Sequence, residues 1–377
     1  MASLTGALQN QPATIIGAGV AGLTVAIALA RRGARVTVLE RADELRQVGA
    51  GLQISPNAGR VLDALGLGSA FSAIAPDNNA LRIRNAEGRL LARLDFKAHR
   101  PNDAFRVVHR ARLIALLQQA ARDAGVMIHL GETIKTLPDA PLLIGADGLH
   151  SIVRPALNGR EVPFFTGQTA WRALIPDTSA EPAVDLFMGP NRHLVSYPLG
   201  GGQRNIVAVM ERRDWQAEGW SYLDDPINLR AAFAGFGGPV PSWLSAVTDP
   251  GIWGLFRHQV AAIWQDGRRV ILGDAAHPTL PFMAQGACLA IEDAWVLAAC
   301  LDSASDRARA LDRYQEIRRP RAAAVVAAAN ANARNYHLTG PARHIAHLGL
   351  RAIGAAAPQR LLARYDWIYD HDPTATA

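Results

Sequence analysis

The chain has 377 residues, of which 49% are hydrophobic and 19% are charged. These proportions are typical of a globular protein with a large core and exclude extensive disorder, and the length suggests two domains. The net charge of +6 comes almost entirely from arginines that are scattered along the chain. Because nucleic-acid-binding surfaces need clustered basic residues, we predict no nucleic-acid partner and expect a field that favours small anionic ligands.

The first residues of the chain and its two cysteines favour a cytoplasmic location. Residues 1–11 lack the basic start and apolar core of a signal peptide. No stretch has the roughly 18 consecutive apolar residues of a membrane span. Cys288 and Cys300 are expected on one helix, about 18 Å apart along its axis, which is too far for a disulfide. We therefore predict a cytoplasmic protein with reduced thiols and no membrane span; a monomer and a homodimer both remain open.

The most informative stretch is near the N-terminus. Residues 14–16 are β-branched, and residues 17–22 then read Gly-Ala-Gly-Val-Ala-Gly before an Ala-rich helical pattern. Gly17 permits a tight turn, Gly19 lets a pyrophosphate approach the backbone, and Gly22 lets the helix pack on the strand. The start of the helix offers free N–H groups to phosphates. A glycine turn that binds nothing is the alternative.

An acidic residue at the right distance favours the ligand-binding interpretation. The strand expected over Arg35–Leu39 ends at Glu40, which lies 23 residues after Gly17. A carboxylate about 20 residues after the first glycine is where the hydroxyls of an adenosine ribose are held. We therefore predict a site for an ADP-ribose group, which NAD and FAD share.

The following segments alternate between loop, helix and strand. We expect a loop with one extended piece over Val48–Asn57 and a helix over Ala58–Leu67. Residues 80–96 have the pattern of a hairpin with a glycine turn, which suggests an excursion into a second domain. A strand-like Val107-Val108 leads into a helix that begins near Arg110 and ends near Ala124.

Further strands are expected over Val126–Leu130 and Leu142–Ile144. Residues 164–256 are rich in strand patterns and tryptophan and poor in helix patterns, and we predict an antiparallel sheet there. Residues 270–272 return to a buried strand, and a helix follows over Gly286–Leu301. The C-terminal part is expected to be helical, with breaks near Pro320 and at Gly340-Pro341.

Three separated motifs now stand in order along the chain. They are the glycine-rich turn with Glu40, then Gly145-Ala146-Asp147-Gly148 with Ser151 and Arg154, and then Gly273-Asp274 after a buried strand. Together they resemble the single-component FAD-dependent aromatic hydroxylases, the group of salicylate hydroxylase and hydroxybenzoate hydroxylase. The resemblance covers nearly the whole chain. One departure is Ala284-Gln285-Gly286, where the family usually has Gly-Gln-Gly.

The resemblance implies an α/β fold. A Rossmann-like FAD-binding domain of the GR2 type would comprise residues 1–75, 97–165 and 257–330. An antiparallel substrate-binding sheet domain would be interleaved with it as residues 76–96 and 166–256. A C-terminal helical segment would span residues 331–377.

The resemblance also assigns cofactor contacts. Asp274 would hold the ribityl chain, since its carboxylate can accept hydrogen bonds from sugar-alcohol hydroxyls at the carboxyl end of a strand. Arg110 would bind the pyrophosphate, a task that suits a guanidinium. Asp147 would take part in binding FAD and NAD(P)H. The alternative is that it is only a turn residue without a ligand. The full set of implied FAD-binding residues is Gly17, Gly19, Val20, Ala21, Gly22, Glu40, Arg41, Gly51, Leu52, Arg110, Asp147, Gly273, Asp274, Gly286 and Ala287. No metal site is predicted.

Candidate catalytic residues lie on one expected strand of the sheet domain. His193 and Tyr197 are four residues apart and would project from the same face of that strand. His193 is a plausible general base for a phenolic substrate, because deprotonation enriches the ring in electrons. A sheet-surface or interdomain contact is the alternative. The resemblance places Pro281 beside the reacting edge of the flavin. Trp171-Arg172 could contact an aryl carboxylate or pack between domains.

The predicted activity follows from this resemblance. It implies an FAD-dependent monooxygenase that consumes NADH or NADPH and O2 and hydroxylates a small phenolic or aryl-carboxylate substrate through a flavin C4a-hydroperoxide. The alternative is a ubiquinone-pathway-type or epoxidase-type flavin monooxygenase with a larger substrate. The substrate, the ring position, an accompanying decarboxylation and the choice of nicotinamide cofactor remain open.

Overall fold

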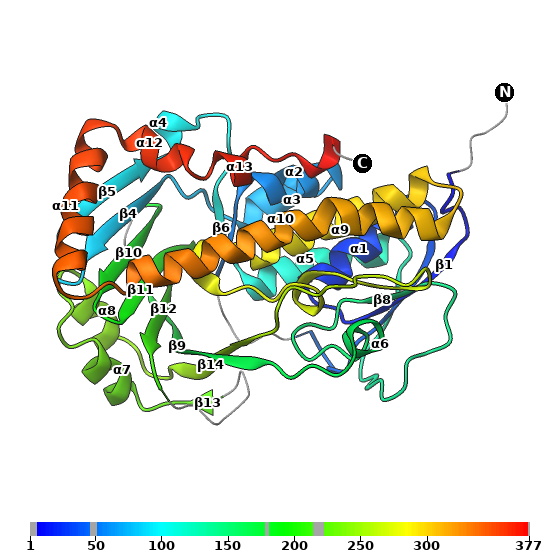
Figure 1. Ribbon diagram of the computed structural model, residues 1–377, viewed down its shortest axis with the longest axis horizontal. Helices are drawn as coiled ribbons and strands as arrows, with labels where there is room; N and C mark the ends of the chain where they lie inside the picture. The colour runs from blue at the N-terminus through cyan, green and yellow to red at the C-terminus, as the bar shows by residue number, and fades with distance from the viewer. Residues whose placement is uncertain (1–5, 46–50, 178–180, 214–221, 376–377) are drawn as a thin grey trace.

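A computed structural model describes residues 6–45, 51–177, 181–213 and 222–375. Two large sheets form the body of the protein, with helices on their outer faces and a long helix across both (Figure 1). The first three residues of the loop predicted over Val48–Asn57, namely Val48, Gly49 and Ala50, lie outside the described residues.

The first sheet is parallel and has the strand order β15-β8-β1-β2-β7. Its strands are short, and the inner strands β8 and β1 are mostly buried, whereas the edge strand β7 has no buried residue. They are β1 (Pro12–Ile16), β2 (Arg35–Leu39), β7 (Met127–His129), β8 (Leu143–Gly145) and β15 (Arg269–Ile271).

The helices around this sheet enclose the main hydrophobic core. Helix α1 (Val20–Ala30) follows β1 directly, and nine of its 11 residues are buried. It packs against α5 (Arg110–Asp123) and α9 (Gly286–Ser303). Both cysteines lie on α9, buried and unpaired.

Short elements complete this part of the molecule. A two-stranded sheet pairs β3 (Gly51–Ile54) with β6 (Arg106–His109). The helix predicted over residues 58–67 is α2 (Pro56–Ala64), which begins two residues earlier because Pro56 fits the first turn of a helix. A second short helix, α3, follows it and was not predicted. The remaining short helices are α3 (Gly68–Ile74), α4 (Phe96–His99) and α6 (Arg154–Asn158), with 3-10 turns η1 (Gly273–Ala275), η2 (Pro281–Met283) and η3 (Pro373–Ala375).

The second sheet has the order β13-β14-β9-β12-β11-β10-β4-β5. Its strands are β4 (Ala80–Asn85), β5 (Leu90–Asp95), β9 (Phe164–Pro176), β10 (Ala183–Gly189), β11 (Arg192–Gly200), β12 (Gln203–Glu211), β13 (Tyr222–Leu223) and β14 (Gly251–Arg257). The antiparallel sheet predicted over residues 164–256 is confirmed, since every strand pair within this range is antiparallel. Strand β10 also pairs in parallel with β4, from the earlier hairpin. Strand β4 precedes β10 by about 100 residues in sequence, and a connection of this length allows the two strands to pair in parallel.

The two faces of the second sheet have different neighbours. One face packs against α7 (Pro226–Ala232) and α8 (Val240–Ser245), with Trp171, Phe187 and Leu194 in the shared core. The opposite face points towards the parallel-sheet part of the molecule. Because side chains alternate along a strand, residues 193, 195 and 197 all belong to this inner face.

The C-terminal helices join the two parts. Helix α10 (Arg307–Tyr336) runs from the parallel sheet to the eight-stranded sheet, and α11 (Gly340–Ala356), α12 (Pro358–Ala363) and α13 (Asp366–Tyr369) follow (Figure 1). The predicted break near Pro320 was wrong, because α10 continues through this residue. Arg318 and Arg321 bind carboxylates of α9 on either side of the proline, and these contacts offset the lost backbone hydrogen bond. The predicted break at Gly340-Pro341 is confirmed.

Candidate active site

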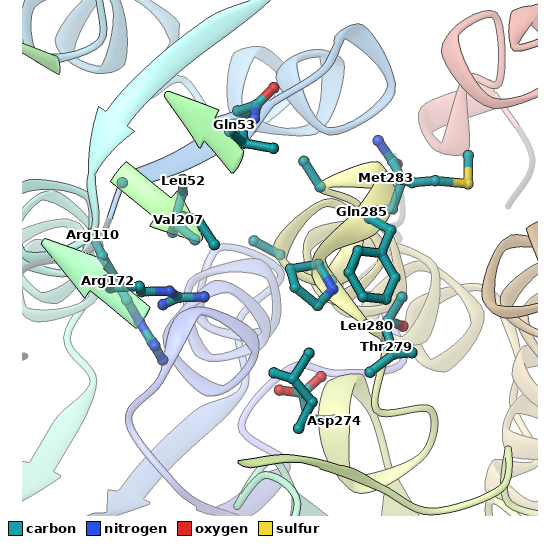
Figure 2. A pocket seen from close by; sticks show the side chains of 18 of the residues that line it. Leu52, Gln53, Arg110, Arg172, Val207, Asp274, Thr279, Leu280, Met283 and Gln285 are labelled. Carbon is teal, nitrogen blue, oxygen red and sulfur yellow. The ribbon is translucent and has the colours of Figure 1, made fainter. Parts of the chain in front are cut away.

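A cavity of about 1910 Å³ lies between the two sheets and is lined by residues of both. Figure 2 shows Arg110, Arg172 and Leu52 on one side, with Asp274 and Leu280 opposite. The cavity brings together most of the predicted site residues: Gly17, Gly19, Val20, Ala21, Glu40, Arg41, Gly51, Leu52, Arg110, Asp147, His193, Tyr197, Asp274, Pro281, Gly286 and Ala287. Gly22 and Gly273 do not line it.

The glycine-rich turn has the backbone that its sequence predicts. Gly17 has φ +101°, a conformation that L side chains rarely adopt. A Cβ at Gly22 would lie 1.8 Å from the carbonyl oxygen of Gly17, so this glycine is required for packing. A Cβ at Gly19 would meet nothing within 4 Å, so the backbone is open to the cavity there. These three positions therefore divide into two structural glycines and one that a ligand can approach.

Glu40 lies directly after β2, beside this turn. Its Oε2 accepts a hydrogen bond from the N–H of Ala18 at 2.7 Å, and Oε1 accepts one from the N–H of Ala42 at 3.0 Å. These two bonds hold the carboxylate at the edge of the cavity. Carboxylate oxygens have further lone pairs, so Glu40 can still accept from a ligand hydroxyl.

Three charged residues, Asp274, Asp147 and Arg110, line the cavity. Burial raises the pKa of Asp274 and of Asp147 above their ordinary values, and it lowers that of Arg110. Nε of Arg110 and Oδ1 of Asp147 are buried and have no hydrogen-bond partner within the described part of the chain. Buried polar groups are normally satisfied, so these atoms indicate the site of a polar ligand.

The Gly273-Asp274 turn is fixed from below by α9. Asp293 accepts hydrogen bonds from the N–H of Gly273 at 3.0 Å and from Arg318 Nε at 2.7 Å, and it contacts His277 Nε2 at 2.5 Å. Glu292 beside it lies 2.7 Å from both Arg318 and Arg321. Despite complete burial, Arg318 and Arg321 lower the pKa of Glu292 to about 2, and His277 and Arg318 lower that of Asp293 to about 2. His277 thus belongs to the support of the turn.

The next cavity segment contains Pro281 in η2 and the start of α9. Ala284 adopts the left-handed conformation, with φ +53°, where the family usually has glycine. The N–H groups of the first turn of α9, which begins at Gly286, are available to stabilise negative charge in the cavity. Ala287 and Gln285 line the cavity on the same side.

Strand β11 directs His193 and Tyr197 into the cavity from the same face. Both side chains are buried. Burial and the neighbouring imidazole of His337 lower the pKa of His193 well below its usual value. Burial also raises the pKa of Tyr197, so its hydroxyl remains protonated and can donate a hydrogen bond. The ring of Tyr197 packs on β3, where a Cβ at Gly51 would lie 2.6 Å from it.

The sequence left two roles open for Trp171-Arg172, and the structure separates the two residues. Trp171 is buried in the outer core and donates a hydrogen bond to Asp224 at 2.7 Å. Arg172 faces the cavity, with its guanidinium carbon 4.6 Å from the centre of the Trp253 ring. Burial lowers the pKa of Arg172 to about 10. Nε has no hydrogen-bond partner among the described residues.

Two further residues, which no local sequence pattern indicates, extend the site away from the cavity. His337, at the end of α10, contacts Nδ1 of His193 with its Nε2 at 2.7 Å. Glu211, at the end of β12, contacts Nδ1 of His337 at 2.8 Å. They are 126 residues apart in sequence, and no local pattern links them.

Comparisons with known proteins agree with this geometry. The sequence matches the FAD-binding domain family over residues 10–139 and 131–329. It is 36% identical over 389 residues to the 3-amino-4-hydroxybenzoate 2-monooxygenase PtmB3 of Streptomyces platensis, with 96% of each chain covered. It is 31% identical over 389 residues to the 3-hydroxybenzoate 6-hydroxylase of Polaromonas naphthalenivorans (strain CJ2), with 95% of each chain covered.

Solved structures share the fold. The salicylate hydroxylase substrate complex superposes with a TM-score of 0.81 at 23% identity, covering 98% of this chain and 97% of that one. Klebsiella pneumoniae HpxO complexed with FAD and uric acid gives 0.81 at 24% identity, covering 94% and 95%. Among the described residues, none of the helices combines the length and apolar character needed to cross a membrane.

Proposed function

The chain belongs to the FAD-binding domain family and is a flavoprotein monooxygenase, and we propose that it hydroxylates a phenolic aryl carboxylate. NAD(P)H would be the reductant and O2 the oxygen donor. The hydroxybenzoate-directed relatives favour this reading over the alternative of a larger ubiquinone-pathway-type or epoxidase-type substrate. The buried free thiols support a cytoplasmic location.

The residues present fit FAD. The open backbone at Gly19 and the start of α1 would receive the pyrophosphate, Glu40 the adenosine ribose and Asp274 the ribityl hydroxyls. The unpartnered atoms of Arg110 and Asp147 would gain hydrogen bonds. When bound, FAD supplies the redox chemistry that accepts a hydride from NAD(P)H and transfers one oxygen atom of O2.

The chain's own residues would prepare the aromatic ring. Nε2 of His193 would accept the phenol proton, since the other ring nitrogen contacts His337. Tyr197, which is four residues further along β11 and packs on β3, would line another part of the substrate cavity. A phenolate is richer in electrons than a phenol, so this transfer makes the ring more reactive towards an electrophilic oxygen. The N–H groups at the start of α9 would stabilise negative charge in the cavity.

The observation that carries the carboxylate part of the proposal is the position of Arg172. Arg172 on β9 pairs with Val207 on β12, which pairs with Val195 on β11, and all three line the cavity. His193 and Tyr197 flank Val195 on the same face. A substrate bridging these strands would place its carboxylate on Arg172 and its hydroxyl on His193. The Arg172 guanidinium is partly buried, and its Nε lacks a hydrogen-bond partner among the described residues, so it would gain from an anionic ligand.

The test compares wild type with Arg172→Met in FAD-loaded protein. With 3-hydroxybenzoate as substrate, we expect the KM of the variant to be about 10–100-fold higher, because the substitution removes a charged hydrogen bond. With phenol, which lacks the carboxylate, the two KM values should agree. Arg309→Met removes an exposed arginine of α10 and is the control. Equal losses with both substrates, or lost FAD binding, would contradict the assignment. If no hydroxylated aromatic product forms in wild type with any phenolic acid, the proposed function fails.

A further inference from the structure

Three side chains form a continuous line from the cavity to the protein surface. Nδ1 of His193 lies 2.7 Å from Nε2 of His337, and Nδ1 of His337 lies 2.8 Å from Oε1 of Glu211. His193 lines the cavity, and both imidazoles are at least 96% buried. The Glu211 side chain is 45% exposed. The line therefore begins at the candidate base and ends in solvent.

The contacts determine where the protons lie on the two rings. A carboxylate can only accept, so Nδ1 of His337 carries a proton that it donates to Glu211. Nε2 of His337 is then an acceptor and receives the Nδ1 proton of His193. Nε2 of His193 consequently has a free lone pair. This is the state that a general base on the cavity side requires.

The backbone holds the three residues in register. The N–H of Asn191, in the turn between β10 and β11, donates to the carbonyl of His337 at 3.2 Å. The carbonyl of Asn191 accepts from the N–H of Glu211 at 2.9 Å. One turn thus fixes the end of α10 and the end of β12 beside β11. Their side-chain contacts follow from this anchoring.

We propose that His193, His337 and Glu211 form a proton path between the substrate hydroxyl and solvent. The inference rests on the proposed function, because it assigns the destination of the proton that His193 accepts. His337 and Glu211 act through His193 and are positioning and relay residues rather than catalytic ones.

Each transfer along the path is balanced. The phenol O–H bond breaks as a bond from hydrogen to Nε2 of His193 forms. The Nδ1 proton of His193 moves to Nε2 of His337, and the Nδ1 proton of His337 moves to Glu211 and then to water. No electrons are exchanged. The reverse sequence protonates the product phenolate and restores both starting tautomers.

The surroundings of His193 explain why the proton has to be passed on. Its ring packs against Phe282 and Tyr336, with ring centres 5.1 and 5.3 Å away. The ionisable groups that face the two imidazoles are Tyr336, Glu211 and Arg192. Burial lowers the pKa of both histidines, while Glu211 partly offsets this effect for His337. A base that holds a proton poorly needs an acceptor, and the exposed carboxylate supplies one.

The first experiment measures proton release in FAD-loaded protein. 3-Hydroxybenzoate is mixed with the protein in weak buffer, and stopped-flow absorbance follows a pH indicator and phenolate formation. His337→Gln keeps a polar side chain of similar reach that does not relay protons. We expect proton release to slow by about 10–100-fold, within the range of general-base effects, with little change in ligand affinity. Glu211→Gln should slow it less, because water reaches the exposed end.

The pH profile and two matched variants separate a relay from a structural role. In His337→Gln, kcat should fall near neutral pH and recover towards wild type as pH rises, while KM stays constant. Added imidazole buffer should raise the slow rate. His344→Gln on exposed α11 and Glu316→Gln on the exposed face of α10 make the same chemical changes elsewhere and should behave as wild type. A normal proton-release rate and pH profile in His337→Gln would overturn the proposal.

A second measurement needs no substrate. Nitrogen-15 NMR of labelled histidines in the FAD-loaded protein reports the tautomer of each ring. We expect both His193 and His337 to carry their proton on Nδ1, and Glu211→Gln to shift the His337 signals most. Protons on Nε2 of both rings would overturn the path even if hydroxylation occurs. If the NMR signals show the proposed tautomers but the protein hydroxylates no aromatic acid, the proton path is supported and only the proposed function is refuted.

Discussion

Two groups of charges lie on opposite sides of the cavity. Beneath the Gly273-Asp274 turn, Glu292 and Asp293 are fully buried and both contact Arg318. On the inner face of the eight-stranded sheet, Arg172 is partly buried and its guanidinium lies over the Trp253 ring, but its Nε has no hydrogen-bond partner among the described residues. The first group is compensated within the chain. The second has the arrangement of a site completed by a ligand.

The two groups of charges act in different parts of the site. A compensated cluster fixes the backbone of the cofactor segment, since Asp293 accepts from the N–H of Gly273. An uncompensated charge costs stability and is retained where it serves binding. Substitutions in the two groups should therefore separate stability from activity.

The largest expected effect comes from breaking the compensated cluster. Arg318→Met leaves two buried carboxylates without their shared partner and should lower the free energy of unfolding by about 3–5 kcal/mol. Urea denaturation measures the change. Arg319→Met, at the adjacent exposed position of α10, should change it by less than about 0.5 kcal/mol. Equal effects of the two substitutions would mean that the buried pairs contribute little.

Acid should weaken the same cluster next. The pKa values of Glu292 and Asp293 are about 2 in the folded protein, below their ordinary values of 4.5 and 3.8. The resulting stability is present above those ordinary values and is lost as pH falls from about 4.5 towards 2. We expect a loss on the order of 2–3 kcal/mol per carboxyl, measured by denaturation at several pH values. In Arg318→Met this acid-dependent loss of stability should be smaller. If the unfolding free energy of the variant falls with pH as steeply as that of wild type, the loss comes from other groups.

The uncompensated side should respond in the opposite direction. Arg172→Met removes a partly buried charge and retains an apolar side chain, so in ligand-free protein the free energy of unfolding should stay within about 1 kcal/mol of wild type or increase. Thermal and urea unfolding measure this, alongside the rise in KM expected above. A loss as large as that of Arg318→Met would show that Arg172 has an essential structural partner, and the comparison would fail.

The smallest effect concerns the turn at Ala284, which lines the cavity. Ala284 is left-handed, so Ala284→Gly should relieve backbone strain and stabilise the protein by about 0.5–1 kcal/mol. Ala324→Gly, in the exposed middle of α10, should instead destabilise by about 1 kcal/mol. The two substitutions are compared by urea denaturation. A loss of stability at Ala284 would argue against strain there.

Local sequence patterns determined much of the nucleotide-binding side. The turn at Gly17, the strand ending at Glu40 and the buried strand before Gly273 depend on neighbouring residues, so period, glycine placement and spacing suffice to predict them. The period of 2 also placed His193 and Tyr197 on one face of β11. The assignment to the family followed from these separated motifs and is confirmed by the comparisons.

Only the tertiary structure decided the rest, because the remaining features depend on contacts between distant segments. Pro320 does not end α10, since ion pairs to α9 hold the helix on both sides. The parallel pairing of β10 with β4 joins segments about 100 residues apart. The orientation of Arg172 into the cavity and the contacts of His337 with His193 and Glu211 arise from packing across three elements. Sequence periodicity carries no information about such encounters.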